Sequence, residues 1–492
     1  MTDTVQTTGG TVRGTPTDGV WAFLGIPYAA APVGAARFAA PGPAPRWDGV
    51  RDATAPGPTC PQAPYAAPAA ALLGNVIEPG DECLNLSVWT PDPGASGLPV
   101  MVWIHGGAFT RGSNRIDSYD GRAFARDGVV LVGINYRLGV TGFLSLDGAP
   151  DNRGLLDQLA ALRWVQDNIR AFGGNPDNVT VFGESAGGMS VATLLASPAA
   201  SGLFHRAVVQ SGNATAASDL EDARRVGAVL ADRLGVPATA EAFGALAPDV
   251  LQAAQDALGL DLAQNPDPAR WGGSVVQRGL GVMSMFPTID GEILPSLPID
   301  AIAAGAGTGV PVLAGTTTDE FRFFLVPTGI AAAITDDNLP FVLQRYGIDP
   351  ALADLYAAHR PGATPGDVLA AVLTDYAFRS GTVTLADAVA RHGGTAWLYE
   401  FAWPSPVQDL RACHALEIAF VFDRLDVSHR LTGDRPPQAL ADEMHRAWVQ
   451  FATTGGPGWA PIDASRPVRV FGGEGDPVVA DPRADELACW IG

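Results

Sequence analysis

The segment from Asn178 to Ala196 constrains this chain more than any other. It begins as the β-branched run Asn-Val-Thr-Val-Phe, continues as Gly183-Glu-Ser185-Ala-Gly187, and passes at once into a helical pattern over Met189–Ala196. A strand that ends in Gly-x-Ser-x-Gly and opens a helix is typical of the turn called a nucleophile elbow, in which the serine is strained and its hydroxyl is lifted clear of the sheet. The alternative is a small-residue turn whose serine only caps the helix.

Short apolar segments alternate with amphipathic ones along the rest of the chain. Because helices separate the predicted strands, we expect an α/β fold with a mostly parallel sheet covered on both faces. We find no internal repeat and expect one domain over residues 1–492, with helical insertions near 213–309 and 325–394. The predicted strands are Val100–Ile104, Val129–Asn135, Val179–Phe182, Ala207–Gln210, Val310–Ala314 and Ala396–Ala402, and the predicted helices include Leu155–Phe172, Leu220–Leu234, Val368–His392 and Ala439–Thr453.

The charged residues of the chain exclude several classes of partner and of chemistry. There are 52 acidic residues against 31 basic ones, and every base is Arg because the sequence contains no Lys. A net charge of −21 argues against nucleic acid and anionic membranes as partners. The absence of Lys excludes Schiff-base chemistry and the phosphate-binding loop that ends in Gly-Lys-Ser/Thr. We therefore expect a small-molecule substrate and a monomer or small homo-oligomer.

Targeting and metal motifs are also missing. The first ten residues have neither a basic start nor an apolar core, and no later run reaches transmembrane length, so we expect a cytoplasmic protein. The four cysteines form no Cys-x-x-Cys pair, and no His-Glu-x-x-His occurs. We expect neither a metal nor another cofactor.

A serine nucleophile needs partners, and the chain offers them. The hydroxyl requires a base, the base requires an orienting acid, and the developing oxyanion requires hydrogen-bond donors. The run Val102-Trp-Ile-His-Gly106-Gly107-Ala-Phe is a strand that enters a glycine-rich loop. The amides of Gly106 and Gly107, with that of Ala186 beside the serine, can serve as the oxyanion hole. The alternative for the glycine pair is an ordinary turn at a strand end.

The acid and the base should follow the serine in that order, as they do in the α/β-hydrolase arrangement. Asp319 and Glu320 follow the predicted strand Val310–Ala314, and chemistry alone leaves both open. The unused carboxylate would be a charge at a helix N-terminus. Among the seven histidines, His414 alone lies on a loop after the strand Ala396–Ala402 and before an apolar helix. It is the candidate base.

The chain resembles the type-B carboxylesterase family, which contains bacterial para-nitrobenzyl esterases and animal cholinesterases. The resemblance covers nearly the whole length. Its motifs are Phe23–Tyr28, Arg37-Phe38, Asp81–Pro91, Gly154–Gln158, Trp164-Val165, Phe172–Pro176, Gln210–Gly212, Ile289–Gly291, Cys413–Phe420 and Trp448–Ala452.

This resemblance implies the α/β-hydrolase fold and a serine carboxylesterase that works through an acyl-enzyme. It selects Glu320 rather than Asp319 as the acid and His414 as the base. The other positions that it implies are the oxyanion hole at Gly106, Gly107 and Ala186, and the neighbours of the triad at Glu184 and Ser211. An amidase, a carbamate hydrolase, a lactonase or a non-catalytic binding protein of the same fold are the alternatives.

The resemblance also implies a disulfide between Cys60 and Cys83, while Cys413 and Cys489 are expected to remain thiols. The loop between Cys60 and Cys83 has no Trp to bind a choline cation, and small residues follow Gly212. We therefore expect uncharged esters with short to medium acyl chains, including aryl and benzyl esters. The site should be lined by the two insertions and by apolar side chains such as Phe286, Phe321, Phe323 and Phe324.

Overall fold

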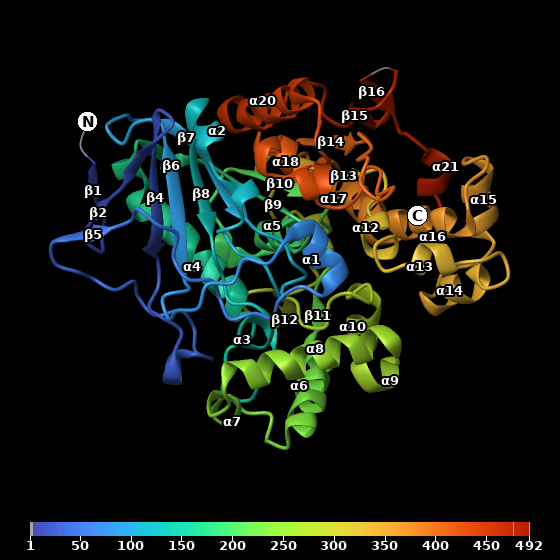
Figure 1. Ribbon diagram of the computed structural model, residues 1–492, viewed down its shortest axis with the longest axis horizontal. Helices are drawn as coiled ribbons and strands as arrows, with labels where there is room; N and C mark the ends of the chain where they lie inside the picture. Colours follow the sequence, from blue (N-terminus) through green and yellow to red (C-terminus); the bar gives the residue numbers. More distant parts are fainter. Residues whose placement is uncertain (1–2, 476, 492) are drawn as a thin grey trace.

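The computed structural model describes residues 3–475 and 477–491. Its centre is an eleven-stranded sheet in the order β16-β15-β14-β13-β10-β9-β7-β8-β6-β4-β3 (Figure 1). The strands are β3 (Thr15–Thr17), β4 (Val20–Pro27), β6 (Asn85–Thr90), β7 (Leu98–Ile104), β8 (Val130–Ile134), β9 (Gly174–Glu184), β10 (Arg206–Gln210), β13 (Val312–Thr317), β14 (Ala396–Phe401), β15 (Pro467–Phe471) and β16 (Val478–Ala480). The strands from β15 through to β8 run parallel, and both ends of the sheet are antiparallel. The predicted α/β-hydrolase fold with a mostly parallel sheet is confirmed.

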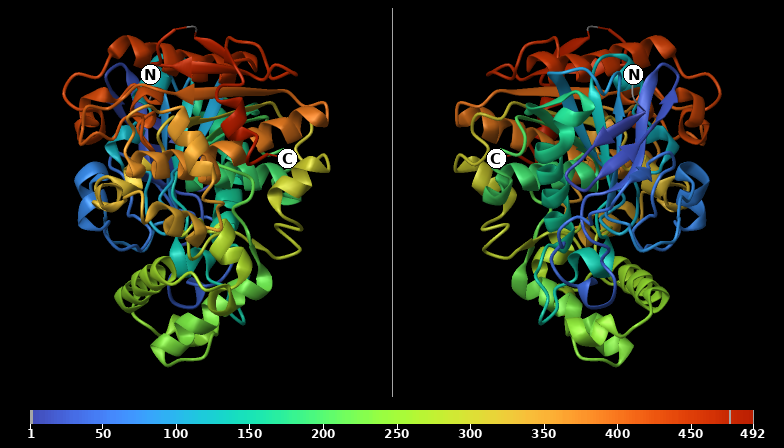
Figure 2. Two further views of the ribbon diagram at one scale, coloured as in Figure 1. Left: turned by 90° about the vertical axis from the view of Figure 1, so that its right-hand side faces the viewer. Right: turned by 90° about the vertical axis from the view of Figure 1, so that its left-hand side faces the viewer.

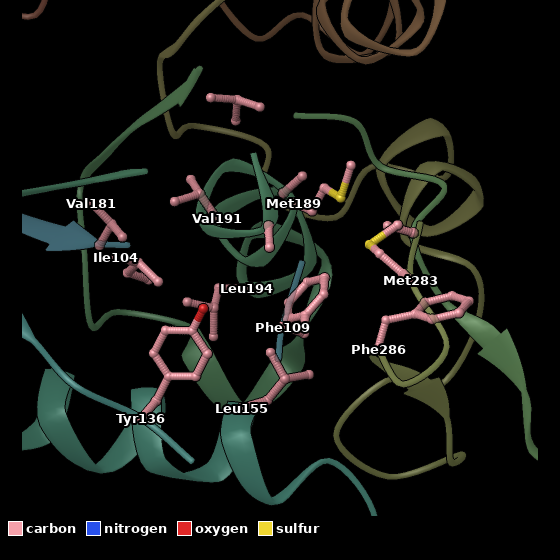
Figure 3. Packing of buried hydrophobic residues seen from close by; sticks show 14 of the residues in the cluster. Ile104, Phe109, Tyr136, Leu155, Val181, Met189, Val191, Leu194, Met283 and Phe286 are labelled. Atoms are coloured by element: carbon pink, nitrogen blue, oxygen red, sulfur yellow. The ribbon is translucent and has the colours of Figure 1, made fainter. Parts of the chain in front are cut away.

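Side chains on alternate positions of β7 show how the sheet is covered. Val100, Val102 and Ile104 belong to one buried cluster, which includes helices α4 (Arg153–Asn168) and α5 (Ala186–Ala196). Figure 3 shows this packing around α5. Met101 and Trp103 belong to the other cluster, which includes α2 (Arg122–Arg126), α18 (Ile418–Val421) and α20 (Gln438–Thr454). Because successive strand residues point to opposite faces, one apolar strand supplies both cores.

Two stretches of helices extend from this sheet. The first contains α6 (Leu220–Leu234), α7 (Ala240–Gly244), α8 (Pro248–Gln264), α9 (Pro268–Trp271), α10 (Gly273–Arg278) and α11 (Pro298–Ala303). Helices α6 to α9 form the lower end of the molecule in Figures 1 and 2. The second contains α13 (Ile330–Ala333), α14 (Leu339–Arg345), α15 (Leu352–Ala358), α16 (Pro365–Thr374) and α17 (Ser380–Arg391). A π turn over Asp375–Arg379 joins α16 to α17, so the single helix predicted over Val368–His392 is interrupted. Within the described residues, no helix combines the length and apolar character that a membrane span requires.

Candidate active site

The predicted elbow lies between β9 and α5. Ser185 has φ 55° and ψ −124°, a conformation that a side chain rarely adopts and that is found mainly where function requires it. Its amide donates to the carbonyl oxygen of Gln210 at 2.9 Å, which ties the turn to β10. A β-carbon on Gly187 would lie 2.0 Å from the carbonyl oxygen of Ile104, so only glycine fits there. The strand, the strained serine and the helix are therefore arranged as the sequence predicts.

The glycine-rich loop after β7 packs directly on this elbow. A β-carbon on Gly106 would lie 2.7 Å from the carbonyl oxygen of Glu184, and one on Gly107 would lie 2.2 Å from that of Arg111. Gly107 also has φ +113°, which favours glycine. Both glycines line the same cavity as Ser185, and Ala186 is the first residue of α5. The three residues predicted to form the oxyanion hole thus lie in the cavity wall or next to the serine in the chain.

His414 and Glu320 meet beside the elbow. The imidazole Nδ1 lies 2.5 Å from Glu320 Oε2. Glu320 Oε1 accepts hydrogen bonds from Ser211 Oγ at 2.6 Å and from the Thr317 amide at 2.8 Å, so its carboxylate is held at both oxygens. It is completely buried. Of the two adjacent acids, Glu320 is the one that the structure brings to the histidine.

The neighbouring acid has different surroundings. The amide of Asp319 donates to the carbonyl oxygen of Ala412 at 2.8 Å. Burial raises the pKa of the Asp319 carboxyl, and the charges of Arg411 and Arg322 oppose that effect. Asp319 therefore lies in a separate electrostatic environment, next to guanidinium groups rather than the imidazole.

The second imidazole nitrogen faces another carboxylate. His414 Nε2 lies 3.1 Å from Glu184 Oε1, at the residue that precedes Ser185. Burial disfavours the charged imidazole, but the carboxylates of Glu184 and Glu320 outweigh it and raise the pKa of His414 to about 9. Burial likewise raises the pKa of Glu184 to about 7, against the opposing charge of His414. The imidazole is thus held between two acids, one on each nitrogen.

A third buried acid lies behind this pair. Glu417 Oε1 accepts a hydrogen bond from Gln210 Nε2 at 3.1 Å, and Gln210 is itself held by the indole of Trp448 at 3.0 Å. Burial, reinforced by Glu184 and Glu320, raises the pKa of Glu417 to about 8. No sequence pattern predicts a role for Glu417, although it stands three residues after His414 within the motif Cys413–Phe420.

Ser185 and His414 open into a cavity of about 550 Å³. Phe321, Phe323 and Phe324 line it as predicted, and both insertions contribute, with Leu280, Val282 and Met283 from the first and Phe378 from the second. The prediction for Phe286 is wrong, because its side chain is buried in the core near Met283 instead of lining the cavity (Figure 3). Phe378 was not predicted, since it lies in the π turn and the apolar pattern continues through that turn unchanged.

The cysteine loop borders the cavity through Tyr65, Ala69 and residues 72–76. Cys60 and Cys83 are both buried thiols in this structure, and Cys60 Sγ lies 3.7 Å from the carbonyl oxygen of Cys83. Burial raises the pKa of the Cys60 thiol, and the hydrogen bond that this thiol donates to Cys83 raises it further. The bond between them stays a prediction.

Comparison with known proteins agrees with this arrangement. The sequence profile described as the carboxylesterase family matches residues 1–467. The para-nitrobenzyl esterase of Bacillus subtilis (strain 168) is 40% identical over 475 residues, which cover 93% of this chain and 91% of the relative. The phenmedipham hydrolase of Pseudarthrobacter oxydans is 35% identical, over 97% of this chain and 96% of the relative.

A solved structure extends the likeness to three dimensions. The crystal structure of carboxylesterase EST55 of Geobacillus stearothermophilus at pH 6.2 superposes with a TM-score of 0.84 at 37% identity, covering 99% of this chain and 100% of the other. Fold, chain length and sequence therefore agree along the whole molecule. The chain belongs to the carboxylesterase family and is a carboxylic ester hydrolase.

Proposed function

We propose that Ser185 is the nucleophile of this esterase, with His414 as its base and Glu320 as the acid that orients the base. The observation that carries the proposal is the 2.5 Å contact between His414 Nδ1 and Glu320 Oε2 in the wall of the cavity that Ser185 lines. With one carboxylate on Nδ1, Nε2 is the nitrogen that exchanges protons with the serine, and it does so beside Glu184 Oε1 at 3.1 Å. Glu184 then stabilises the imidazolium that forms when the serine is deprotonated.

The reaction follows from these positions. Ser185 Oγ attacks the ester carbonyl while His414 takes its proton, and the oxyanion is stabilised by the amides of Gly106, Gly107 and Ala186. The imidazolium then returns the proton to the departing alcohol, which leaves an acyl-enzyme. Water, deprotonated by the same histidine, attacks the acyl group and releases the carboxylic acid. The serine hydroxyl is restored at the end.

Labelling and replacement of Ser185 test the assignment. Ser185→Ala should abolish labelling by a fluorophosphonate and lower kcat by roughly 10⁴- to 10⁶-fold. Ser190→Ala is a matched control, because Ser190 is a buried serine on the same helix that accepts a hydrogen bond from Gln158 at 3.0 Å. The control should keep its label and its activity. Near-normal hydrolysis by folded Ser185→Ala would contradict the proposal.

The cavity supports uncharged apolar esters as substrates. Four phenylalanines line it, and apolar surface contributes about 25 cal/mol per Å² removed from water. The name of the Bacillus subtilis relative gives a para-nitrobenzyl ester as its substrate, which supports aryl and benzyl esters here. The alternative is a carbamate or amide substrate. Phenmedipham is the first compound to test for it, because one relative is named phenmedipham hydrolase. A series of p-nitrophenyl esters from acetate to octanoate, with phenmedipham alongside, tests both.

We further propose that the chain forms one domain and acts as a monomer or small homo-oligomer. The central sheet supports the single domain, because its strands come from residues 15 to 480 and both buried clusters pack on it. A single cooperative unfolding transition is expected for one domain, and light scattering of the purified protein gives the oligomeric state. Two separate transitions would contradict the single domain.

A further inference from the structure

The π turn between α16 and α17 presents one side chain to the catalytic cavity. π turns are rare in proteins as a whole, but those that do occur are often found at functional sites. Phe378, inside the turn, lines the cavity, and its ring centroid lies 4.8 Å from that of His414. The same ring lies 6.4 Å from Phe324 with the two planes 9° apart. Phe378 is therefore part of the surface against which the imidazole rests.

The other side of the turn is tied to the last residues of the chain. The carboxylate of Asp375 accepts hydrogen bonds from Tyr356 Oη at 2.8 Å and from Arg379 Nη1 at 3.1 Å. Tyr356 Oη in turn accepts one from Trp490 Nε1 at 2.8 Å, and Arg379 donates to the carbonyl oxygen of Pro482. Asp375 and Arg379 are buried, so these bonds are little weakened by solvent.

A second set of contacts fixes the same C-terminal segment. Helix α21 (Ala484–Leu487) contacts the π turn. Its Glu486 is bound by Arg360 at 2.5 and 2.9 Å. Arg483 binds Glu400 of β14, and Glu400 Oε1 accepts a hydrogen bond from Thr318 Oγ1 at 3.3 Å, two residues before Glu320. The segment thus contacts both the π turn and the loop that carries the triad acid.

We propose that Asp375 is a positioning residue for His414: anchored through Tyr356 to the C-terminal Trp490, it holds the π turn that places Phe378 against the imidazole. This inference rests on the proposed function, because it takes His414 as the base. A base that is displaced by about 1 Å can cost roughly 100-fold in rate. A bulky ring fixed at 4.8 Å limits such displacement without touching the substrate's reacting atoms.

Removing one oxygen atom tests the hydrogen-bonded link from Asp375 through Tyr356 to Trp490. Tyr356→Phe deletes the hydroxyl that joins Asp375 to Trp490, and it should lower kcat by between about 3- and 100-fold with KM changed less than about twofold. Tyr28→Phe is the matched control, because it also deletes a buried hydroxyl, which donates to the Asn135 carbonyl oxygen at 2.7 Å, outside the cavity. Both variants should lower Tm, but only Tyr356→Phe should lower kcat. Equal kcat in the two variants would overturn the proposal.

A double-mutant cycle shows whether the effect passes through Phe378. Tyr356→Phe should lower kcat in the native background and have no further effect on kcat in a Phe378→Leu background, while the losses in Tm still add. Asp375→Asn should repeat the kcat loss, and if that variant does not fold, the cycle with Tyr356→Phe decides. Losses in kcat that simply multiply would overturn the route through Phe378.

The two proposals fail separately. If the native protein takes no fluorophosphonate at Ser185, the proposed function is wrong. If Ser185 is labelled normally and kcat of Tyr356→Phe equals that of Tyr28→Phe, only the positioning role of Asp375 is wrong.

Discussion

Glu184→Gln should shift the pH dependence of hydrolysis toward acid, because Glu184 is the carboxylate on Nε2 of the base. Across the 3.1 Å between Glu184 Oε1 and His414 Nε2, Coulomb's law gives about 5 kcal/mol at an effective dielectric constant of about 20 and about 1.3 kcal/mol in water. The site lies between these limits, since His414 is buried but lines an open cavity. Removing the charge favours the neutral imidazole, so the pKa of His414 should fall from about 9 to between about 5 and 8.

The same substitution should lower the maximal rate. On the plateau the imidazole is neutral at rest, so Glu184 stabilises the imidazolium only as it forms in the transition state, where each 1.4 kcal/mol lost costs about tenfold. The expected profile of kcat/KM therefore has a lower plateau that is reached at a lower pH. The assay is hydrolysis of p-nitrophenyl butyrate between pH 5 and 10, with a correction for spontaneous hydrolysis. The acid limb of this profile reports the base in the free enzyme.

Asp319→Asn is the control for this experiment. Asp319 is also a partly buried carboxyl near the site, but the charges that act on it are those of Arg411 and Arg322. Its removal should leave the acid limb where it is in the native enzyme. An acid limb that does not move in Glu184→Gln, or that moves equally in Asp319→Asn, would refute the assignment of Nε2 to Glu184.

Three further predictions follow from the site. Glu320→Gln should lower kcat by roughly 10⁴-fold and Asp319→Asn by less than about tenfold. If steady-state assays give the reverse order, Asp319 and not Glu320 is the acid that orients His414. Oxidation should join Cys60 to Cys83 across 22 intervening residues and stabilise the protein by about 3 kcal/mol, whereas alkylation of Cys60 in a non-reducing peptide map would count against the bond. Neutral esters from propionate to hexanoate should be hydrolysed at least as well as acetate and better than acetylcholine; a preference for acetylcholine in kcat/KM would contradict the apolar cavity.

The sequence predicts the centre of the sheet better than its edges. Every predicted strand belongs to the parallel part, where burial on both faces produces a continuous apolar run. The antiparallel strand β4 was not predicted, since Gly25 and a shift of register between Phe23 and Ile26 break its pattern. Strands β3 and β16 have only three residues each, too few for a period to be visible.

The candidate site also has a part that the sequence predicts and a part that it does not. The elbow and the glycine loop are local, so their residues could be found from adjacent positions in the chain. Glu320 and Asp319 are neighbours in sequence, and only the folded chain separates them by turning one toward His414 and the other toward Arg411. The contact of Glu184 with Nε2 depends on segments that are more than 200 residues apart, and no periodicity encodes it.

Three buried glutamates around one imidazole explain why the protons of this site are shared. Glu184, Glu320 and Glu417 are all buried, and the charges of the first two raise the pKa of the third. Glu320 accepts hydrogen bonds from two donors besides its contact with the imidazole, whereas among the described residues Glu417 accepts one, from the amide of Gln210. A proton added near neutral pH therefore goes to Glu417 or to the pair of Glu184 and His414. The base therefore exchanges its proton inside a cluster in which Glu184 and Glu417 also change charge near neutral pH.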